Sequence, residues 1–221
     1  MNGKQIVTKL DYLLHWIVRL VMLNVLWIVF SVCGLVAVGI FPATTAVLGV
    51  ARKWQMGEED LKIWNTFKQI YRQEFLASNM MGWILSIVGI ILYLNYQALS
   101  ILGDEIVFYV PFAFYFIVFF YTILVIWSFP LLTHYKATCL QHFKNGIIIG
   151  LSKIHYTILS GTVIFAGIYF SLSYPGVIPF FTVSVIGMGC MWFSLQIFRQ
   201  LDGQQKKPSN TSEIEEQPTL A

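Results

Sequence analysis

The sequence predicts an all-α protein, a polytopic bundle of transmembrane helices. Hydrophobic residues make up 57% of its 221 residues and charged residues only 11%, whereas a soluble domain carries about 25% charged residues. Asp, Glu, Lys and Arg are absent from four long stretches, residues 20–51, 75–103, 106–135 and 154–198. A bilayer core needs roughly 20 consecutive apolar residues as a helix, because backbone groups in lipid must bond within their own segment. These stretches therefore predict membrane-spanning helices.

The first helix begins with an amphipathic segment at residues 1–19, and its membrane span is expected at about 20–40. Asp11, His15 and Arg19 fall four residues apart, so they line one stripe of this helix. The stripe has two interpretations, an anion-binding or proton-linked cluster and a row of interfacial ion pairs. Its position at the entry of the helix, where long side chains reach the lipid headgroups, favours the ion pairs.

Residues 41–54 predict a short membrane segment. Pro42 stands near the first turn of this segment, where a helix tolerates proline. The apolar run ends at Arg52 and Lys53 and is too short to cross an ordinary bilayer alone. Two arrangements stay open: a re-entrant dip, and a marginal span formed together with residues 35–42.

Residues 60–75 predict an amphipathic helix that lies in the membrane interface. Acidic residues at its start favour the positive end of a helix, and its apolar and polar side chains separate onto two faces. Glu74 falls on the apolar face. We expect it to pair with Lys68 or with a basic residue of another segment, and a role in binding a substrate is the alternative.

Four further spans bring the number of long spans to five. The first two of these form an antiparallel hairpin, because Gly103, Asp104 and Glu105 leave only a short link between them. Pro130 is expected to kink the second, since proline removes a backbone hydrogen bond. The four spans are expected at about 80–102, 106–132, 154–173 and 177–198, with a basic, helical loop at 133–153.

Residues 203–221 predict a disordered tail, because they contain almost no large apolar side chains and cannot bury a core. The membrane domain is therefore expected to comprise residues 1–202.

The lysines and arginines predict the orientation, because cytoplasmic loops are enriched in these residues. All 14 fall before residue 20, within 52–72, within 136–153 or after 198. If residues 35–54 form an extra membrane segment, every one of these charges lies inside, and so do both termini. With five spans alone, the N-terminus would lie outside. The six-segment arrangement is preferred, and the expected location is the cell membrane, with the basic segments on its cytoplasmic side.

Several motifs together resemble the YesL family. They are Phe41-Pro42-Ala43-Thr44-Thr45-Ala46, Arg52-Lys53-Trp54, Gly57-Glu58-Glu59-Asp60, Ser128-Phe129-Pro130-Leu131-Leu132, Lys144-Asn145 and the segment from Trp192 to Leu201. The resemblance covers most of residues 10–202. It implies a small multi-pass bacterial membrane protein of undefined activity, often encoded beside genes for carbohydrate uptake. Phe41 stands where most members have glycine before the proline.

No residue set predicts catalysis, a cofactor or a metal site. His134, Cys139 and His142 lack both a fourth ligand and the spacing of a zinc site, and the three cysteines are expected to be free thiols. No glycine-rich phosphate loop is present, and the basic residues are too mixed with acids to indicate nucleic acid. The aromatic third long span is better explained by contact with lipid than by sugar stacking. Asn24, alone in the first span, is expected to bond to another helix.

The sequence therefore favours a non-enzymatic accessory or regulatory membrane protein linked to carbohydrate uptake. Its expected partners are the lipid bilayer and a membrane complex such as a carbohydrate ABC transporter. The alternative is a small transporter that acts as an oligomer, although the spans are poor in the polar residues that a transport path requires. The residues of interest for either function are Asp11, His15, Arg19, Pro42, Glu74 and Pro130.

Overall fold

The computed structural model describes residues 3–102 and 109–205, and almost all of them are helical. The expected link at residues 103–105 and the tail beyond residue 205 lie outside this part of the chain. The elements are α1 (Gly3–Cys33), α2 (Ile40–Gln55), α3 (Ile63–Gln73), α4 (Phe75–Leu102), α5 (Tyr109–His134), α6 (Cys139–Ser152), α7 (Ile154–Ser173), the 3-10 turn η2 (Pro175–Val177) and α8 (Thr182–Gln205).

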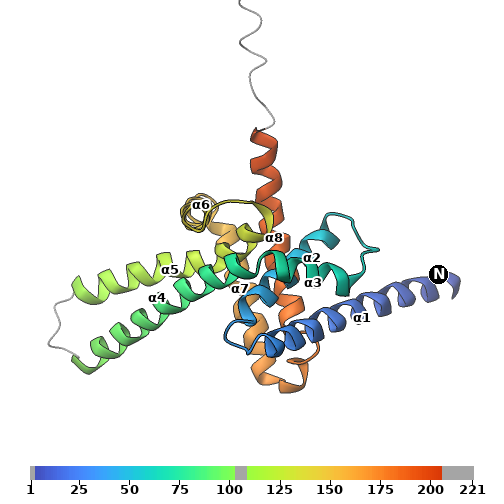
Figure 1. Ribbon diagram of the computed structural model, residues 1–221, viewed down its shortest axis with the longest axis horizontal. Coiled ribbons are helices and arrows are strands. Elements are labelled where there is room, and N and C mark those ends of the chain that lie inside the picture. Colours follow the sequence, from blue (N-terminus) through green and yellow to red (C-terminus); the bar gives the residue numbers. More distant parts are fainter. Residues whose placement is uncertain (1–2, 103–108, 206–221) are drawn as a thin grey trace, which may run out of the picture.

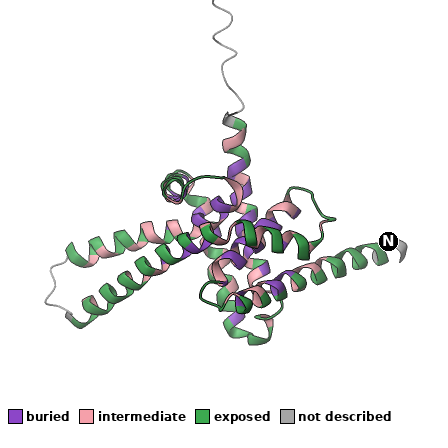
Figure 2. Ribbon diagram, in the orientation of Figure 1, coloured by how far each residue is buried: buried purple, intermediate pink, exposed green. Residues whose placement is uncertain are grey.

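The helices spread from a common centre (Figure 1). Helices α4 and α5 run side by side to one side of it, α1 extends to the other, and α7 and η2 lie below while α8 runs upward. Buried residues gather at this centre, and the outer parts of α1, α4 and α5 are exposed (Figure 2). Many large apolar side chains of these outer parts are exposed, as expected for surfaces that face lipid.

Helix α2 is the hub of the fold. It packs against α1, α3, α4, α5 and α8. Four of its small or medium-sized side chains are fully buried: Ala43, Ala46, Val50 and Ala51. Small side chains such as alanine let neighbouring helices approach closely. The short helix expected near 41–54 is therefore present and enclosed by other helices. Its 16 residues span about 24 Å, less than a bilayer core of about 30 Å.

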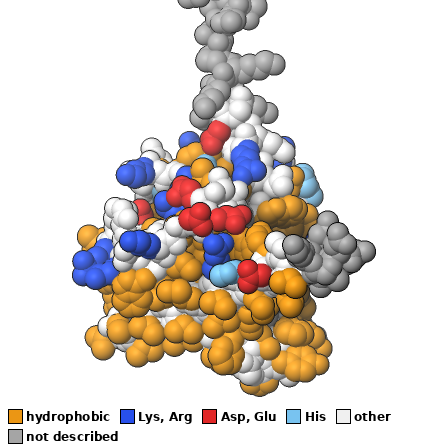
Figure 3. Space-filling model, turned by 90° about the vertical axis from the view of Figure 1, so that its right-hand side faces the viewer, with side chains coloured by type: hydrophobic (Ala, Val, Ile, Leu, Met, Phe, Trp, Pro, Cys, Tyr) orange, Lys and Arg blue, Asp and Glu red, His pale blue; other side chains and the backbone are white. Residues whose placement is uncertain are grey.

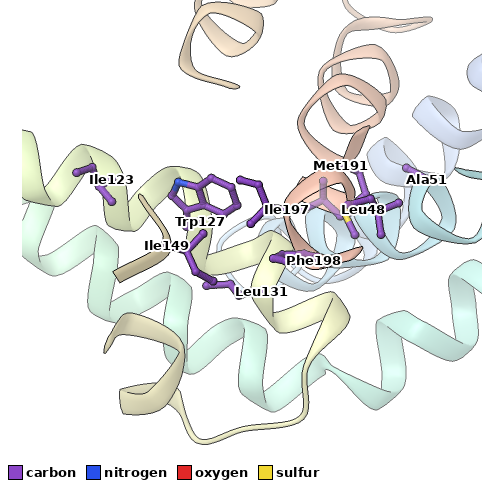
Figure 4. Close-up of a cluster of buried hydrophobic side chains, with 10 residues drawn as sticks. Leu48, Ala51, Ile123, Trp127, Leu131, Ile149, Met191, Ile197 and Phe198 are labelled. Carbon is purple, nitrogen blue, oxygen red and sulfur yellow. The ribbon is translucent and has the colours of Figure 1, made fainter. Parts of the chain in front are cut away.

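A cluster of large apolar side chains joins α2, α5, α6 and α8 (Figure 4). Trp127 of α5, Ile149 of α6 and Phe198 of α8 belong to it. The indole Nε1 of Trp127 donates a hydrogen bond to Thr157 Oγ1 at 2.9 Å, and that hydroxyl donates to the carbonyl of Gly150 at 2.9 Å. The one polar atom of the tryptophan is thus paired inside the core.

Four described helices, α1, α4, α5 and α7, are long and apolar enough to cross a membrane. Hydrophobic side chains cover the lower part of the face in Figure 3, and charged side chains gather above them. The fifth long span expected at 177–198 corresponds to α8, which begins only at Thr182 and carries Arg199 and Asp202 near its end. A count of five spans stays a prediction.

The prediction that the first span continues to about residue 40 is wrong, because α1 ends at Cys33. The chain then turns through residues 34–39, and Leu35 and Val36 adopt positive φ angles of 58° and 57°. Gly34 and Gly39 lie against each other with no room for a side chain between them. This close contact lets α2 fold back directly onto α1.

Asn24 joins α1 to the start of α8. It is 0% exposed. Its Nδ2 donates to the carbonyl of Ile178 at 3.0 Å, and its Oδ1 accepts from the backbone N–H groups of Val183 at 2.9 Å and Ser184 at 3.3 Å. The first N–H groups of a helix have no partner within the helix, so Asn24 caps α8 from a neighbouring helix. The expected bond between helices is present.

Candidate functional site at the polar end

The polar end of the molecule comprises the C-terminal ends of α2, α5 and α8 with the α2–α3 and α3–α4 connections. Arg19 of α1 reaches it, because its guanidinium lies 3.6 Å from the Glu59 carboxylate and 3.9 Å from that of Asp60. Asp11 and His15 lie 3.9 Å apart with exposed side chains. Arg19 therefore ties α1 to the loop between α2 and α3.

The end of α8 is held to α5 by a carboxylate. Asp202 accepts a hydrogen bond from the Tyr135 hydroxyl at 2.9 Å and lies 3.3 Å from His134 Nε2. Burial, together with the hydrogen bond to Asp202, raises the pKa of Tyr135 to about 12, so the phenol keeps its proton. The sequence offers no local signal for this contact, because 68 residues separate His134 from Asp202.

Arg52 links the end of α2 to the end of α5. Its Nη1 donates to the Thr133 carbonyl at 2.8 Å, which is one of the carbonyls that a helix leaves unpaired at its C-terminus. The neighbouring Lys53 instead pairs with Glu58 at 2.9 Å. At the other side of α2, Arg199 of α8 donates to the Gln55 carbonyl at 3.0 Å. Together with Arg19 of α1, basic residues from three distant segments thus meet at one end of the fold.

Two adjoining hollows, of about 210 and 430 Å³, open between these elements. We call them together the polar hollow. Both are lined by Gln73, Glu74, Leu132, Tyr135 and Lys136. The first is also lined by Arg52, and the second by His142. This is the place where charged and hydrogen-bonding side chains from α2, α5, α6 and the α3–α4 junction converge.

Glu74 lies in the polar hollow rather than on a helix face. Helix α3 ends at Gln73, so Glu74 caps it, and the Glu74 N–H donates to the Ile70 carbonyl at 2.9 Å. Among the described residues, no basic group lies within salt-bridge distance of its carboxylate, so the expected pair with Lys68 does not form. Burial raises the pKa of Glu74, and the nearby charge of Lys136 acts in the opposite direction.

His142 is the most buried polar side chain of the polar hollow, at 1% exposed. Neither ring nitrogen has a partner in hydrogen-bonding geometry among the described residues. Burial lowers the pKa of His142 below its ordinary value of 6.5, and the Ala137 carbonyl acts in the opposite direction. The ring is therefore neutral at physiological pH.

This burial predicts a loss of stability in mild acid. As the pH falls below about 6.5, the unfolded chain protonates His142 while the folded chain does not, so the folded state loses free energy relative to the unfolded state. We expect the thermal midpoint of the purified protein to fall between pH 7 and pH 5, and to fall less in His142→Gln. His155→Gln, at an exposed position of α7, is the matched control. Equal pH profiles for wild type and His142→Gln would contradict a lowered pKa of His142 in the folded protein.

The two prolines of interest occupy structural positions. Pro42 is the third residue of α2 and is buried, and its missing N–H costs nothing in the first turn of a helix. Pro130 lies inside α5, four residues before its end. It lines an apolar cavity of about 130 Å³ between α2, α5, α7 and α8. Neither proline belongs to the polar hollow.

The described residues contain no group of three or more His, Cys, Asp or Glu side chains that could hold a metal ion. His134 points to Asp202, whereas His142 lines the polar hollow from α6. Cys33, Cys139 and Cys190 are free thiols.

Known proteins with similar sequences are uncharacterized. Residues 20–96 match a family described as a protein of unknown function, DUF624. The uncharacterized protein YesL of Bacillus subtilis strain 168 is 27% identical over 198 residues, which cover 90% of this chain and 93% of the relative. YteU of the same organism is 31% identical over 201 residues, 90% of each chain. The chain belongs to the YesL family.

A further YesL-family relative in the same organism, YesV, is 29% identical over 191 residues, which cover 85% of this chain and 90% of the relative. No solved structure matches the chain. The match to the family covers α2, α3 and the Glu74 junction, so it includes one wall of the polar hollow. The other walls, on α5 and α6, lie within the longer alignment to YteU.

Proposed function

We propose that this YesL-family protein is a non-enzymatic accessory or regulatory component of the bacterial cytoplasmic membrane, linked to carbohydrate uptake. It acts with a membrane partner such as a carbohydrate ABC transporter. One observation carries the proposal: the charged groups converge at one end of the fold, while the cavity among the central helices is apolar. A protein built in this way presents a polar surface to one side of the membrane without a polar path across it.

The proposed topology places the polar end in the cytoplasm. Arg19 contacts the α2–α3 loop, Arg52 contacts the end of α5, and Arg199 contacts the end of α2. These contacts support one shared side for the basic segments, and cytoplasmic segments are enriched in Lys and Arg. In this arrangement α1, α4, α5, α7 and α8 cross the membrane, α2 crosses as a short sixth segment, and α3 lies at the interface.

The alternative, a small transporter acting as an oligomer, has less support. Among the described residues that line the cavity between α2, α5, α7 and α8, only Thr44 and Cys190 have a polar side-chain atom, and the others are apolar or glycine. A polar solute that left water for such a cavity would lose its hydrogen bonds without replacement.

The outer parts of α1, α4 and α5 offer the surface for a membrane partner. Phe112 and Tyr115 of α5 and Tyr93 of α4 are more than half exposed. Apolar, aromatic surfaces of this kind pack against lipid or against another transmembrane helix.

Isolation of the tagged protein from its native membrane in mild detergent, followed by mass spectrometry, tests the proposal. We expect a transporter component in stoichiometric amount, which an untagged strain must not yield. A purified homo-oligomer that carries solute into proteoliposomes, without any such partner, would contradict the accessory role and establish the transporter.

A further inference from the structure

We propose that the polar hollow binds a phosphate-type anion through Arg52 and Lys136. The anion is the headgroup of an acidic phospholipid, or else a free phosphate or phosphate ester from the aqueous phase. This site is separate from the proposed partner contact on the outer helices, so either proposal can fail without the other.

Two cations of the hollow have no carboxylate partner. Among the described residues, neither Arg52 nor Lys136 forms a salt bridge, whereas the adjacent Lys53 is paired with Glu58 at 2.9 Å. Glu58 and Asp202 act on Arg52 only at longer range. Of the residues that the structure describes, Glu74 is the only acidic one that lines either part of the hollow. The balance of formal charge at its wall is therefore positive.

The hollow also contains buried polar atoms that lack a partner. The Nε–H of Arg52 is buried and has no hydrogen-bond partner in the described part of the chain, although Nη1 of the same guanidinium is bound to the Thr133 carbonyl. Both ring nitrogens of His142, which is 1% exposed, likewise lack a partner in hydrogen-bonding geometry among the described residues. Buried polar groups in proteins are almost always paired. An oxyanion in the first part of the hollow would accept from Arg52, and one in the second part would accept from the one N–H of a neutral His142.

The location suits a phosphate. Apolar Leu132 and Ala77 line the same hollow as Lys136, so the site lies at the ends of α5 and α4 where the apolar helices meet the charged end. Basic pockets between transmembrane helices on the cytoplasmic side bind the headgroups of acidic lipids. Arginine and lysine side chains bind phosphate oxygens by charge-assisted hydrogen bonds.

Three single substitutions test the proposal. Lys136→Gln removes one cation that makes no hydrogen bond with the described residues, and we expect it to weaken anion binding about fivefold, the effect of one basic residue near a membrane surface. Glu74→Gln removes a carboxylate that lines the hollow and should strengthen binding. Lys144→Gln, at an exposed position of α6 outside the hollow, has the same charge change and should leave binding unchanged.

The full-length protein is purified in phosphate-free buffer. The shift of its thermal midpoint is then measured against phosphatidylglycerol or phosphatidylcholine in the micelle and, separately, against inorganic phosphate. A stabilisation by phosphatidylglycerol alone that weakens in Lys136→Gln identifies a lipid headgroup. The same pattern with inorganic phosphate identifies a soluble phosphate. The proposal is overturned if neither anion stabilises the protein, or if Lys136→Gln and Lys144→Gln weaken binding equally.

Discussion

Asn24→Ala is expected to lower the free energy of unfolding by about 2 kcal/mol, because buried polar groups left without partners cost about 1–3 kcal/mol each and hydrogen bonds between membrane helices contribute somewhat less than this. The substitution leaves the Ile178 carbonyl and the N–H groups of Val183 and Ser184 without the partner they have in the fold. It also releases the start of α8 from α1. Unfolding in mixed micelles with increasing SDS measures the change.

Asn95→Ala is the matched control for this prediction. Asn95 is exposed on α4, and its Nδ2 donates to the Ile91 carbonyl of its own helix at 2.8 Å. Its loss should change the free energy of unfolding by less than about 0.5 kcal/mol, as is usual for surface substitutions. If Asn24→Ala is no more destabilising than Asn95→Ala, the cap of α8 by α1 does not stabilise the fold.

Gly39→Ala is expected to destabilise the protein by about 3 kcal/mol, the upper part of the usual range for overpacking. A Cβ at Gly39 would lie 2.5 Å from the Ser31 carbonyl oxygen and 2.8 Å from that of Phe30. These are backbone atoms of α1, and both carbonyls accept hydrogen bonds within the turn at residues 34–39. The clash therefore cannot be relieved by rotating a side chain, so α2 must move away from α1.

Gly176→Ala provides the comparison, because a Cβ at Gly176 would meet no atom within 4 Å. The same addition of one methyl group should be nearly neutral there. The two variants are compared by thermal midpoint and by yield from the membrane. Equal stability of Gly39→Ala and Gly176→Ala would show that α1 and α2 do not approach as closely as the structure has them.

Composition predicts the long helices because the absence of charge over a whole span depends only on local sequence. The expected hydrogen bond of Asn24 follows in the same way, since a lone amide among apolar residues must find a partner. Its partner, the start of α8, could not be predicted, because about 160 residues separate the bonded groups. The turn after Cys33 was also hidden within a continuous apolar stretch, where hydropathy does not change.

The polar hollow illustrates why the candidate site was only partly predictable. The sequence singles out Glu74 by its position on a helical face, yet the helix ends one residue earlier and the side chain lines the polar hollow together with Lys136. Arg52 and His142 carry no local pattern that links them to Glu74. Their proximity depends on how α2, α5 and α6 pack, which is a property of the folded chain.

Labelling of single cysteines tests most directly the central claim that α2 crosses the membrane and brings all basic segments to the cytoplasmic side. Leu35, 84% exposed in the turn between α1 and α2, and Glu58, in the loop after α2, are each replaced by cysteine after the three native cysteines have been changed to serine. A membrane-impermeant maleimide should label Leu35→Cys in intact cells, and Glu58→Cys only after the membrane is permeabilised. Labelling of both positions from the same side would contradict the six-segment topology.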